Sequence, residues 1–179
     1  TKQGGVVVWV VGDATINGSE TGTSFRQALY FKDVCGFNLH DTMIFHKEAV
    51  PLTHNRYEQK FEFMFVLSKG RPNTFNGLRL PSARAGYSRA SYKMRQDSDE
   101  LTDRSAKGVV AATKLKGNVW KLAVGCNGAT KDKEAHRHPA IFPEQLAADH
   151  IASWSNPGDV VLDPFLGSGT TGKMALLEC

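Results

Sequence analysis

The residues best suited to chemistry lie near the end of the 179-residue chain, between a hydrophobic run and a helical segment. Three hydrophobic residues, 160–162, lead into Asp163, and small residues and glycines follow. The pattern predicts a strand over 160–163 and the start of a helix over 172–177. A strand that ends in a glycine turn at a helix N-terminus is how α/β proteins bind nucleotide-like ligands, because the glycines let the backbone approach the ligand. We call residues 163–171 the glycine turn.

Spacing alone leaves several interpretations of the glycine turn open. Gly167-x-Gly169-x-x-Gly172 fits the dinucleotide-binding fingerprint, whose ribose-binding acid would lie about 20 residues on, past the last residue of the chain. The spacing from Gly167 to Lys173 nearly fits a phosphate loop, but that motif needs Ser or Thr next to hold magnesium, and this chain has Met174. A purely structural turn is the remaining alternative.

The complete string of the turn is more specific than either glycine spacing. It is Asp-Pro-Phe-Leu-Gly-Ser-Gly-Thr-Thr. This string resembles the S-adenosylmethionine-binding motif of the DNA amino-methyltransferases, which methylate adenine N6 or cytosine N4. The resemblance implies S-adenosylmethionine as cofactor, bound by Asp163, Pro164, Phe165, Gly167, Ser168, Gly169, Thr170 and Thr171.

The segment before the turn adds to the resemblance. Pro143 suits the first turn of a helix, the helical pattern continues to Trp154, and Pro157-Gly158 ends it. In the resembling family this block packs against the methionine end of the cofactor, which implies contacts from Pro139, Ala140 and Phe142. A block placed here, directly before the cofactor motif, is typical of the circularly permuted β group of the family.

The first 70 residues contain the elements that would position the turn. Hydrophobic patterns and turn residues predict a buried parallel strand at Gly5–Val11, a helix at Phe25–Cys35 with Ser24 as its cap and Gly36 as its stop, and strands at Thr42–Phe45 and Phe61–Leu67. This succession resembles the second half of the methyltransferase sheet, whose last strands form a β-hairpin. We therefore expect an α/β, Rossmann-like S-adenosylmethionine-dependent methyltransferase fold with a partial sheet.

The middle of the chain is strongly basic. Residues 71–137 carry 14 Lys and Arg against 6 Asp and Glu, a formal +8, whereas the remainder carries 8 against 12, a formal −4. Tyr87 and Tyr92 are interleaved with basic residues, a mixture that suits phosphate contacts and base stacking on DNA. A solvated basic loop is the alternative. The resembling family has its target-recognition region here, which implies DNA contacts from Arg79, Arg84, Arg89, Lys93 and Arg95.

One expected motif is absent from the sequence. The resembling family polarises the target amine with an Asp/Ser/Asn-Pro-Pro-aromatic motif, and the seven prolines of this chain include no adjacent pair. In the β group that motif precedes the strand at Gly5–Val11, and its own strand separates Gly5–Val11 from 160–163. We therefore expect the chain to be an internal fragment, inactive by itself. Its sheet should show either a gap or a non-native pairing between those two segments.

The predicted organisation has three parts. Residues 1–70 form the second half of the sheet, 71–135 the target-recognition insertion, and 136–179 the cofactor block. The complete protein is expected to methylate the amino group of adenine or cytosine in double-stranded DNA. A catalytically silent DNA-binding module and a phosphate-loop protein are the alternatives.

Composition sets further bounds. No hydrophobic window is long enough to span a bilayer and no secretory signal is visible, and the resemblance implies a cytoplasmic enzyme with a cognate restriction endonuclease as a candidate partner. Three scattered cysteines indicate free thiols in a reducing compartment. The pair His136-x-His138 has no partner ligands at metal spacing, so no metal site is predicted.

Overall fold

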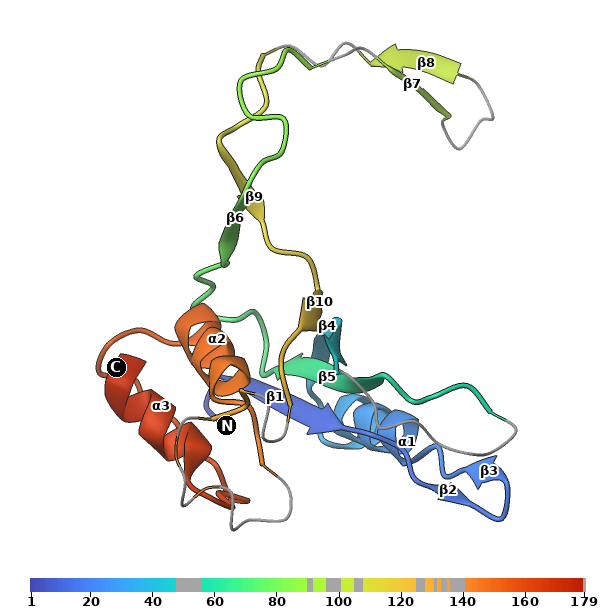
Figure 1. Cartoon of the computed structure of the whole chain (residues 1–179), viewed down its shortest axis with the longest axis vertical. Coiled ribbons are helices and arrows are strands. Elements are labelled where there is room, and N and C mark those ends of the chain that lie inside the picture. Colours follow the sequence, from blue (N-terminus) through green and yellow to red (C-terminus); the bar gives the residue numbers. More distant parts are fainter. Residues whose placement is uncertain are drawn as a thin grey trace. The chain divides into compact units, whose positions relative to one another are not determined.

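The computed structural model separates the chain into two compact units (Figure 1). The main unit comprises Thr1–Asn76 with Gly117–Cys179, and the inserted unit comprises Gly77–Lys116. The structure describes residues 1–47, 56–89, 92–95, 101–104, 108–124, 128–130, 132, 135 and 141–178.

A four-stranded sheet forms the centre of the main unit. Its strands are β1 (Val6–Val11), β5 (Phe61–Ser68), β4 (Asn38–His46) and β10 (Val119–Lys121), in that spatial order. The antiparallel β4–β5 pair is the expected hairpin of last strands. The expectation that the first strand is buried and parallel to its neighbour was wrong. Strand β1 is half-buried and pairs antiparallel with β5, because β5 lies between β1 and β4.

One face of the sheet packs against the first helix. Helix α1 (Thr23–Leu29) continues into the π-helical turn η1 (Tyr30–Val34), and Gly36, at φ 67°, follows the end, as predicted. The core on this side includes residues from α1, η1, β1 and β5: Ala28, Phe65 and Leu67, with Val7, Trp9, Val11, Phe31 and Phe63 around them.

The start of that helix differs from the prediction. Ser24 is not the residue before the helix; it is buried inside the first turn, and its backbone N–H donates to Asp13 Oδ1 at 3.1 Å. The Ser24 hydroxyl also donates to the Asp13 carboxylate, and this bond is the main reason that the pKa of Asp13 lies below its usual value. The carboxylate 11 residues upstream therefore satisfies the helix N-terminus in place of a local cap.

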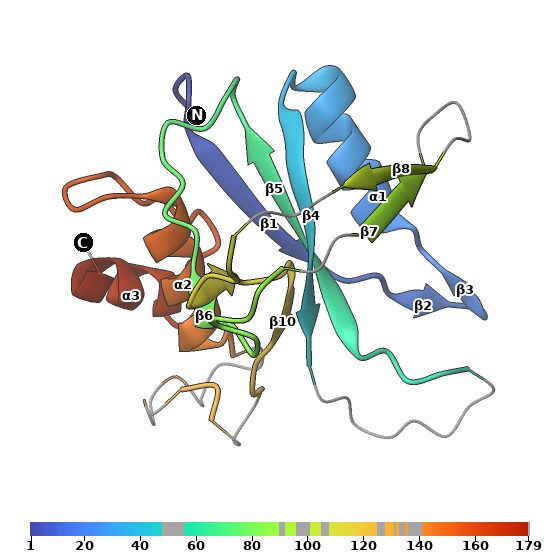
Figure 2. The ribbon, with the colours of Figure 1, turned by 90° about the horizontal axis from the view of Figure 1, so that it is seen from above.

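The opposite face of the sheet packs against α2 (Glu144–Trp154). Leu146 is fully buried, and His150 Nε2 lies 3.3 Å from Met64 Sδ of β5. Figure 2 shows α1 and α2 on opposite sides of the sheet, as in a layered α/β architecture. Trp120 of β10 is buried on this side against His150, so it is a core residue of the main unit.

Helix α3 (Thr170–Glu178) packs against α2 rather than against the sheet core. Their shared cluster contains Ala147, Ala148, Ile151 and Met174, with Phe142, Val161 and Ala175 packed around it. A short hairpin, β2 (Thr15–Ile16) and β3 (Ser19–Glu20), completes the main unit. None of the helices that the structure describes is long and apolar enough to cross a membrane.

The predicted strand at 160–163 is absent. These residues have irregular backbone, and Val160 and Leu162 are 92% and 84% exposed. Among the described residues, β1 has a strand partner on one side only, so the sheet ends where the next strand was expected. A β-forming run without a neighbouring strand has no partner for its ladder hydrogen bonds. Neither expected outcome occurs as stated: 160–163 does not pair with β1, and it does not form a strand on the far side of a gap.

The inserted unit is built from two-stranded ladders. Strands β6 (Arg79–Pro81) and β9 (Thr113–Leu115) pair antiparallel, as do β7 (Tyr92–Arg95) and β8 (Leu101–Arg104). Large hydrophobic side chains of this unit, including Leu80, Tyr87, Val109 and Leu115, are exposed. Two-stranded ladders of this kind are marginal in water by themselves, so this unit is suited to gain order from a partner.

Candidate functional site: the glycine turn and the basic inserted unit

The glycine turn is held in place by its own backbone and side chains. Asp163 Oδ1 accepts the Phe165 N–H at 2.9 Å, and the Gly169 N–H donates to the Leu166 carbonyl at 2.8 Å. Gly167 and Gly169 both adopt left-handed backbone, at φ 56° and 83°. A residue with a Cβ pays about 1–2 kcal/mol for this conformation, so the turn requires glycine at both positions.

The turn ends at the N-terminus of α3. Thr170, the first residue of the helix, is buried, and its hydroxyl lies 3.1 Å from the Ser168 hydroxyl. A Cβ built on Gly169 would meet nothing within 4 Å, so open space borders the turn. Open space beside a helix N-terminus, with a carboxylate at the other end of the turn, suits a ligand with a polar, nucleotide-like part.

The helix after the turn does not provide the groups of a phosphate loop. Met174, at the position where magnesium would need a hydroxyl, is buried in the α2–α3 cluster. Lys173 Nζ lies 2.6 Å from Glu144 Oε1 of α2. Their hydrogen bond is the main cause of a raised pKa for Lys173 and a lowered pKa for Glu144, which also accepts the Thr130 hydroxyl. The lysine therefore joins α2 to α3. A phosphate loop needs a free lysine and a hydroxyl for magnesium, and neither is present at these positions.

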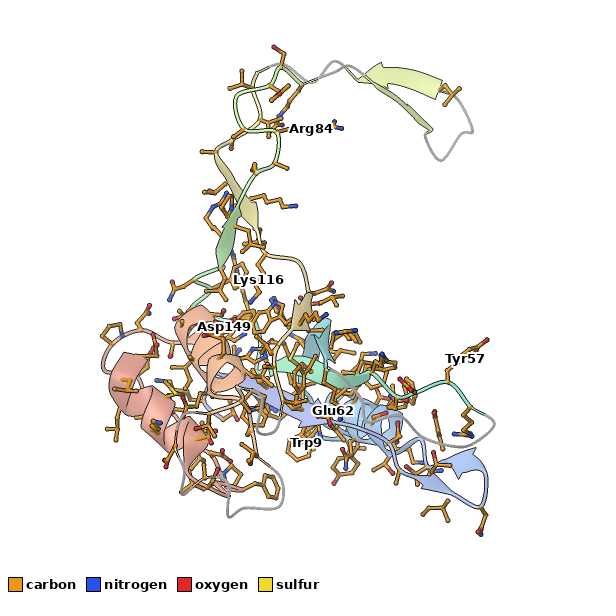
Figure 3. All side chains as sticks on the ribbon, in the orientation of Figure 1. Trp9, Tyr57, Glu62, Arg84, Lys116 and Asp149 are labelled. Atoms are coloured by element: carbon orange, nitrogen blue, oxygen red, sulfur yellow. The ribbon has the colours of Figure 1, made fainter. Side chains whose placement is uncertain are left out.

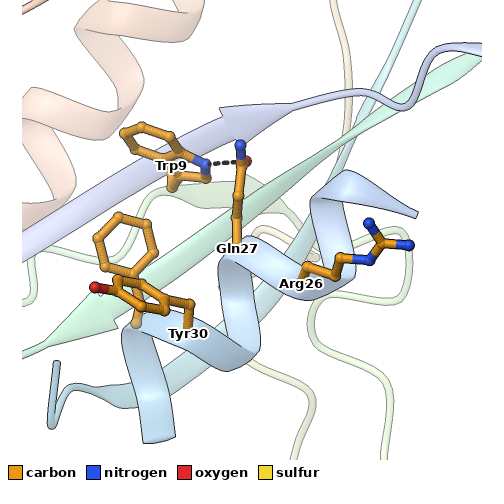
Figure 4. Close-up of a pocket in the computed structure, with 5 residues that line it drawn as sticks. Trp9, Arg26, Gln27 and Tyr30 are labelled. Atoms are coloured by element: carbon orange, nitrogen blue, oxygen red, sulfur yellow. Dashed lines mark hydrogen bonds between the residues drawn. The ribbon is translucent and has the colours of Figure 1, made fainter. Parts of the chain in front are cut away.

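An aromatic contact links the turn to the sheet. The ring of Phe165 lies edge-on to Trp9 of β1, with centroids 5.8 Å apart. Trp9 Nε1 donates to Gln27 Oε1 at 2.8 Å, beside an open hollow of about 340 Å³ lined by Trp9, Arg26, Gln27, Tyr30 and Phe31 (Figure 4). The sequence analysis missed this role of Trp9. A lone tryptophan within a run of valines was the available signal, because an aromatic there needs a partner of its own.

The structure places only part of the predicted methionine-end block. Phe142 is half-buried and packs against the α2–α3 cluster, whereas Pro139 and Ala140 lie outside the described residues, as do His136 and His138. The predicted helix of this block is α2, which begins at Glu144 directly after Pro143. The described residues hold no group of three or more His, Cys, Asp or Glu side chains that could bind a metal ion.

The five predicted DNA-contacting residues all lie in the inserted unit. Arg79 connects β6 to β9, because its Nε donates to Thr113 Oγ1 at 2.8 Å and its Nη2 to the Thr113 carbonyl at 3.1 Å. Arg84, in the loop after β6 (Figure 3), and Arg89 are exposed. Lys93 and Arg95 lie on β7, of which the structure describes the backbone.

Fold and site together define a class of protein: a layered α/β protein with a glycine turn suited to a nucleotide-like cofactor and an attached basic unit. Comparison with known proteins identifies the family within that class. A family model described as DNA methylase, for N6- and N4-methylating enzymes, matches residues 1–178, and the chain belongs to this family.

Two curated relatives support the assignment. The orphan methyltransferase M.BamHII of Bacillus amyloliquefaciens is 52% identical over 181 residues, which cover 99% of this chain and 68% of the relative. The DNA adenine methyltransferase YhdJ of Escherichia coli K12 is 34% identical over 122 residues, which cover 67% of this chain and 38% of the relative.

Solved structures show the same fold. The cytosine-N4-specific PvuII DNA methyltransferase matches with a TM-score of 0.67 and 18% identity, over 99% of this chain and 57% of that protein. The M1.HpyAVI–SAM complex matches with a TM-score of 0.55 and 21% identity, over 98% of this chain and 65% of that protein. The Rossmann-like methyltransferase fold is therefore confirmed, and the chain spans about two thirds or less of these proteins.

Proposed function

We propose that the complete protein transfers a methyl group from S-adenosylmethionine to the exocyclic amino group of adenine or cytosine in double-stranded DNA. The observation that carries the proposal is the glycine turn, with its two left-handed glycines, the Asp163 carboxylate at its beginning and the N-terminus of α3 at its end. Membership of the DNA methylase family and the likeness to a SAM complex support the choice of cofactor.

The turn residues would divide the work of holding that cofactor. Asp163 would offer its carboxylate as a hydrogen-bond acceptor, Gly167 and Gly169 would keep the backbone bare, and the α3 N-terminus would present N–H groups from Thr170 and Thr171. Pro164, Phe165 and Ser168 would shape the turn, with Phe165 seated against Trp9. The cofactor, when bound, would supply an electrophilic methyl group on a sulfonium sulfur.

Calorimetric titration of the complete protein tests whether S-adenosylmethionine is the cofactor. We expect S-adenosylmethionine to bind and Mg-ATP not to bind. Gly169→Val should weaken the cofactor at least about tenfold, because valine disfavours φ 83° and fills the open space. Asp163→Ala should weaken it by removing an acceptor. Gly86→Val is the matched control, because Gly86 has φ 80° and open surroundings in the inserted unit. Binding of Mg-ATP alone would refute the proposal.

The resembling family activates the target amine with a motif that contains two adjacent prolines, and these 179 residues contain no such pair. We therefore propose that this chain alone leaves DNA unmethylated. Incubation with DNA and labelled S-adenosylmethionine should give no label above background, whereas the complete protein should label it. Enzyme-dependent transfer by the chain alone would show that its catalytic motif is of another kind. If the complete protein also fails, the catalytically silent DNA-binding module becomes the better explanation.

The basic segment would supply the DNA contacts. Each phosphate contact contributes about −0.9 to the slope of log K against log salt on duplex DNA. Replacing Arg84, Arg89 and Lys93 together with Ala should reduce the slope by up to about 3 if each contacts a phosphate. The control replaces Lys114, Lys116 and Lys121 instead. Fluorescence anisotropy over a salt series measures the slope for both triple variants. Equal reductions of the slope in the two variants would favour diffuse contact by a basic loop.

The choice between adenine and cytosine and the presence of a restriction partner stay open within this proposal. The relatives include an adenine methyltransferase and the fold likeness includes a cytosine-N4-specific enzyme. The relative M.BamHII is named an orphan methyltransferase. Analysis of the methylated base in product DNA decides the first point.

A further inference from the structure

The residue from which the chain leaves the main unit is held tightly. The Asn76 backbone N–H donates to the Ser153 carbonyl at 2.8 Å. Its side-chain Nδ2 lies 3.2 Å from the Ala152 carbonyl, 3.0 Å from the Ser155 carbonyl and 3.1 Å from Asn156 Oδ1. One amide thus satisfies carbonyls at the C-terminal end of α2, where a helix has no partners of its own. The inserted unit begins at the next residue.

Neighbouring contacts reinforce this attachment. The ring of Phe75 packs on Trp154, the last residue of α2, with centroids 4.9 Å apart. Asn156 Nδ2 donates to Thr74 Oγ1 at 3.1 Å. Three consecutive residues before the inserted unit, 74–76, therefore contact the last turn of α2 or the two residues that follow it.

The residue at which the chain returns is tied to the same helix. Trp120 Nε1 donates to the carbonyl of Gly117, the first residue of the main unit after the insertion, at 2.9 Å. The buried ring of Trp120 lies on His150 in the middle of α2, with centroids 4.5 Å apart. Within the inserted unit, the Lys116 N–H donates to the Leu78 carbonyl at 2.7 Å, so the leaving and returning segments are paired directly beyond both attachments.

The same helix also holds the glycine turn. Helix α2 leads through residues 155–162 into the turn, and Met174 of α3 packs into its face. At its other end, Glu144 bonds to Lys173 of α3. Among the described residues, α2 thus contacts Asn76 directly, is linked to Gly117 through Trp120, and contacts the helix that starts at the turn.

We propose that α2 couples DNA binding by the inserted unit to cofactor binding at the glycine turn, with Asn76 and Trp120 as the positioning residues. The inference rests on the proposed function. DNA that orders the paired segments would act on α2 through the existing contacts of Asn76 and Gly117, and the packing of α2 sets the position of α3. Because coupling between two ligands is reciprocal, DNA should then tighten S-adenosylmethionine, and S-adenosylmethionine should tighten DNA.

The affinity for S-adenosylmethionine, measured on the complete protein with and without a saturating DNA duplex, tests the coupling. For the unaltered protein we expect DNA to tighten the cofactor at least about fivefold. Asn76→Ala should bring that ratio close to one while the cofactor affinity without DNA stays within about twofold, because Asn76 lies outside the turn. Asn118→Ala is the matched control: Asn118 is next to the return point but donates to the Thr42 carbonyl of β4, and its variant should keep the coupling.

Two further variants separate coupling from stability. Asn76→Asp keeps the shape but places a carboxylate against helix carbonyls, so it should abolish coupling at least as completely as Ala, whereas a residue needed only for its volume would tolerate Asp. Trp120→Phe keeps an aromatic ring on His150 but removes the donor to Gly117, so it should reduce the coupling. This variant tests the inference even if the Asn76 variants do not fold. Unchanged coupling in these folded variants, or no coupling in an unaltered protein that methylates DNA, overturns the inference. Failure of the unaltered protein to bind S-adenosylmethionine at all overturns the proposed function and this inference with it.

Discussion

Two runs of β-forming residues in the main unit differ in structure: one is a strand and the other is not. Phe61–Ser68 lies at the centre of the sheet as β5, hydrogen-bonded to β1 and β4, and Met64, Val66 and Leu67 are fully buried. Residues 160–162 are also hydrophobic but have no strand partner among the described residues; Val160 and Leu162 face solvent, and Val161 packs against the α2–α3 cluster. Strand-forming composition therefore produces a strand only where neighbours supply the ladder and cover the side chains.

The glycine turn keeps its shape although the run that leads into it is not a strand. Its conformation comes from the hydrogen bonds that the Phe165 N–H donates to the Asp163 carboxylate and the Gly169 N–H donates to the Leu166 carbonyl, and from the packing of α3 on α2. The glycine turn can thus form without a strand before it. Substitutions in the partnered strand β5 and in the unpartnered run 160–162 test the comparison.

The largest effect is expected in β5. Met64→Ala removes a fully buried side chain that touches His150, and it should lower the free energy of unfolding by about 2–5 kcal/mol. Urea denaturation followed by circular dichroism measures this loss. Val160→Ala, at an exposed position in the unpartnered run, is the control and should change stability by less than about 0.5 kcal/mol. Similar losses for both variants would remove the distinction between the two regions.

The accuracy of the sequence-based predictions also depends on whether a segment's partners lie nearby in the sequence. Where a segment finds its partners nearby, as in the β4–β5 hairpin and in α2, pattern and end signals placed the elements within a few residues. The errors occurred where distant residues decide. The start of α1 depends on Asp13, 11 residues away, and residues 160–163 have no strand partner among the described residues. Likewise, the lone Trp9 in its valine run indicates that it needs a partner, but no local pattern identifies that partner as Phe165.

A smaller, pH-dependent effect is expected at the junction of β1 and α1. Bonds from Ser24 lower the pKa of Asp13, so the folded state binds its proton more weakly than the unfolded state. The stabilisation is therefore complete above the unfolded pKa of about 3.9 and is lost as pH falls through the lower folded value. Asp13→Ala should cost about 0.5–2 kcal/mol at neutral pH.

Urea denaturation at pH 7 and at pH 3 measures this dependence. The gap between Asp13→Ala and the unaltered chain should narrow at the lower pH. Asp33→Ala, which removes an acid whose side chain is 61% exposed, controls for the loss of one negative charge. A gap that stays constant over the range would mean that the Asp13 carboxylate does not hold the helix start.

The smallest effect is expected at Leu162, where the comparison can be reversed. Leu162→Ser in this 179-residue chain should change the free energy of unfolding by less than about 0.5 kcal/mol, because the side chain is 84% exposed. If the complete protein supplies the neighbouring strand that the family resemblance implies, the same residue becomes buried and the substitution should cost about 2 kcal/mol or more. Urea denaturation of both proteins, each with and without the substitution, gives the two changes in the free energy of unfolding.

Hydrogen exchange adds an independent measure, since the amides of 160–163 should exchange rapidly in the 179-residue chain while those of β5 are protected. A large cost in the short chain would mean that these residues find a partner in solution, and equal small costs in both proteins would mean that the run never becomes a strand.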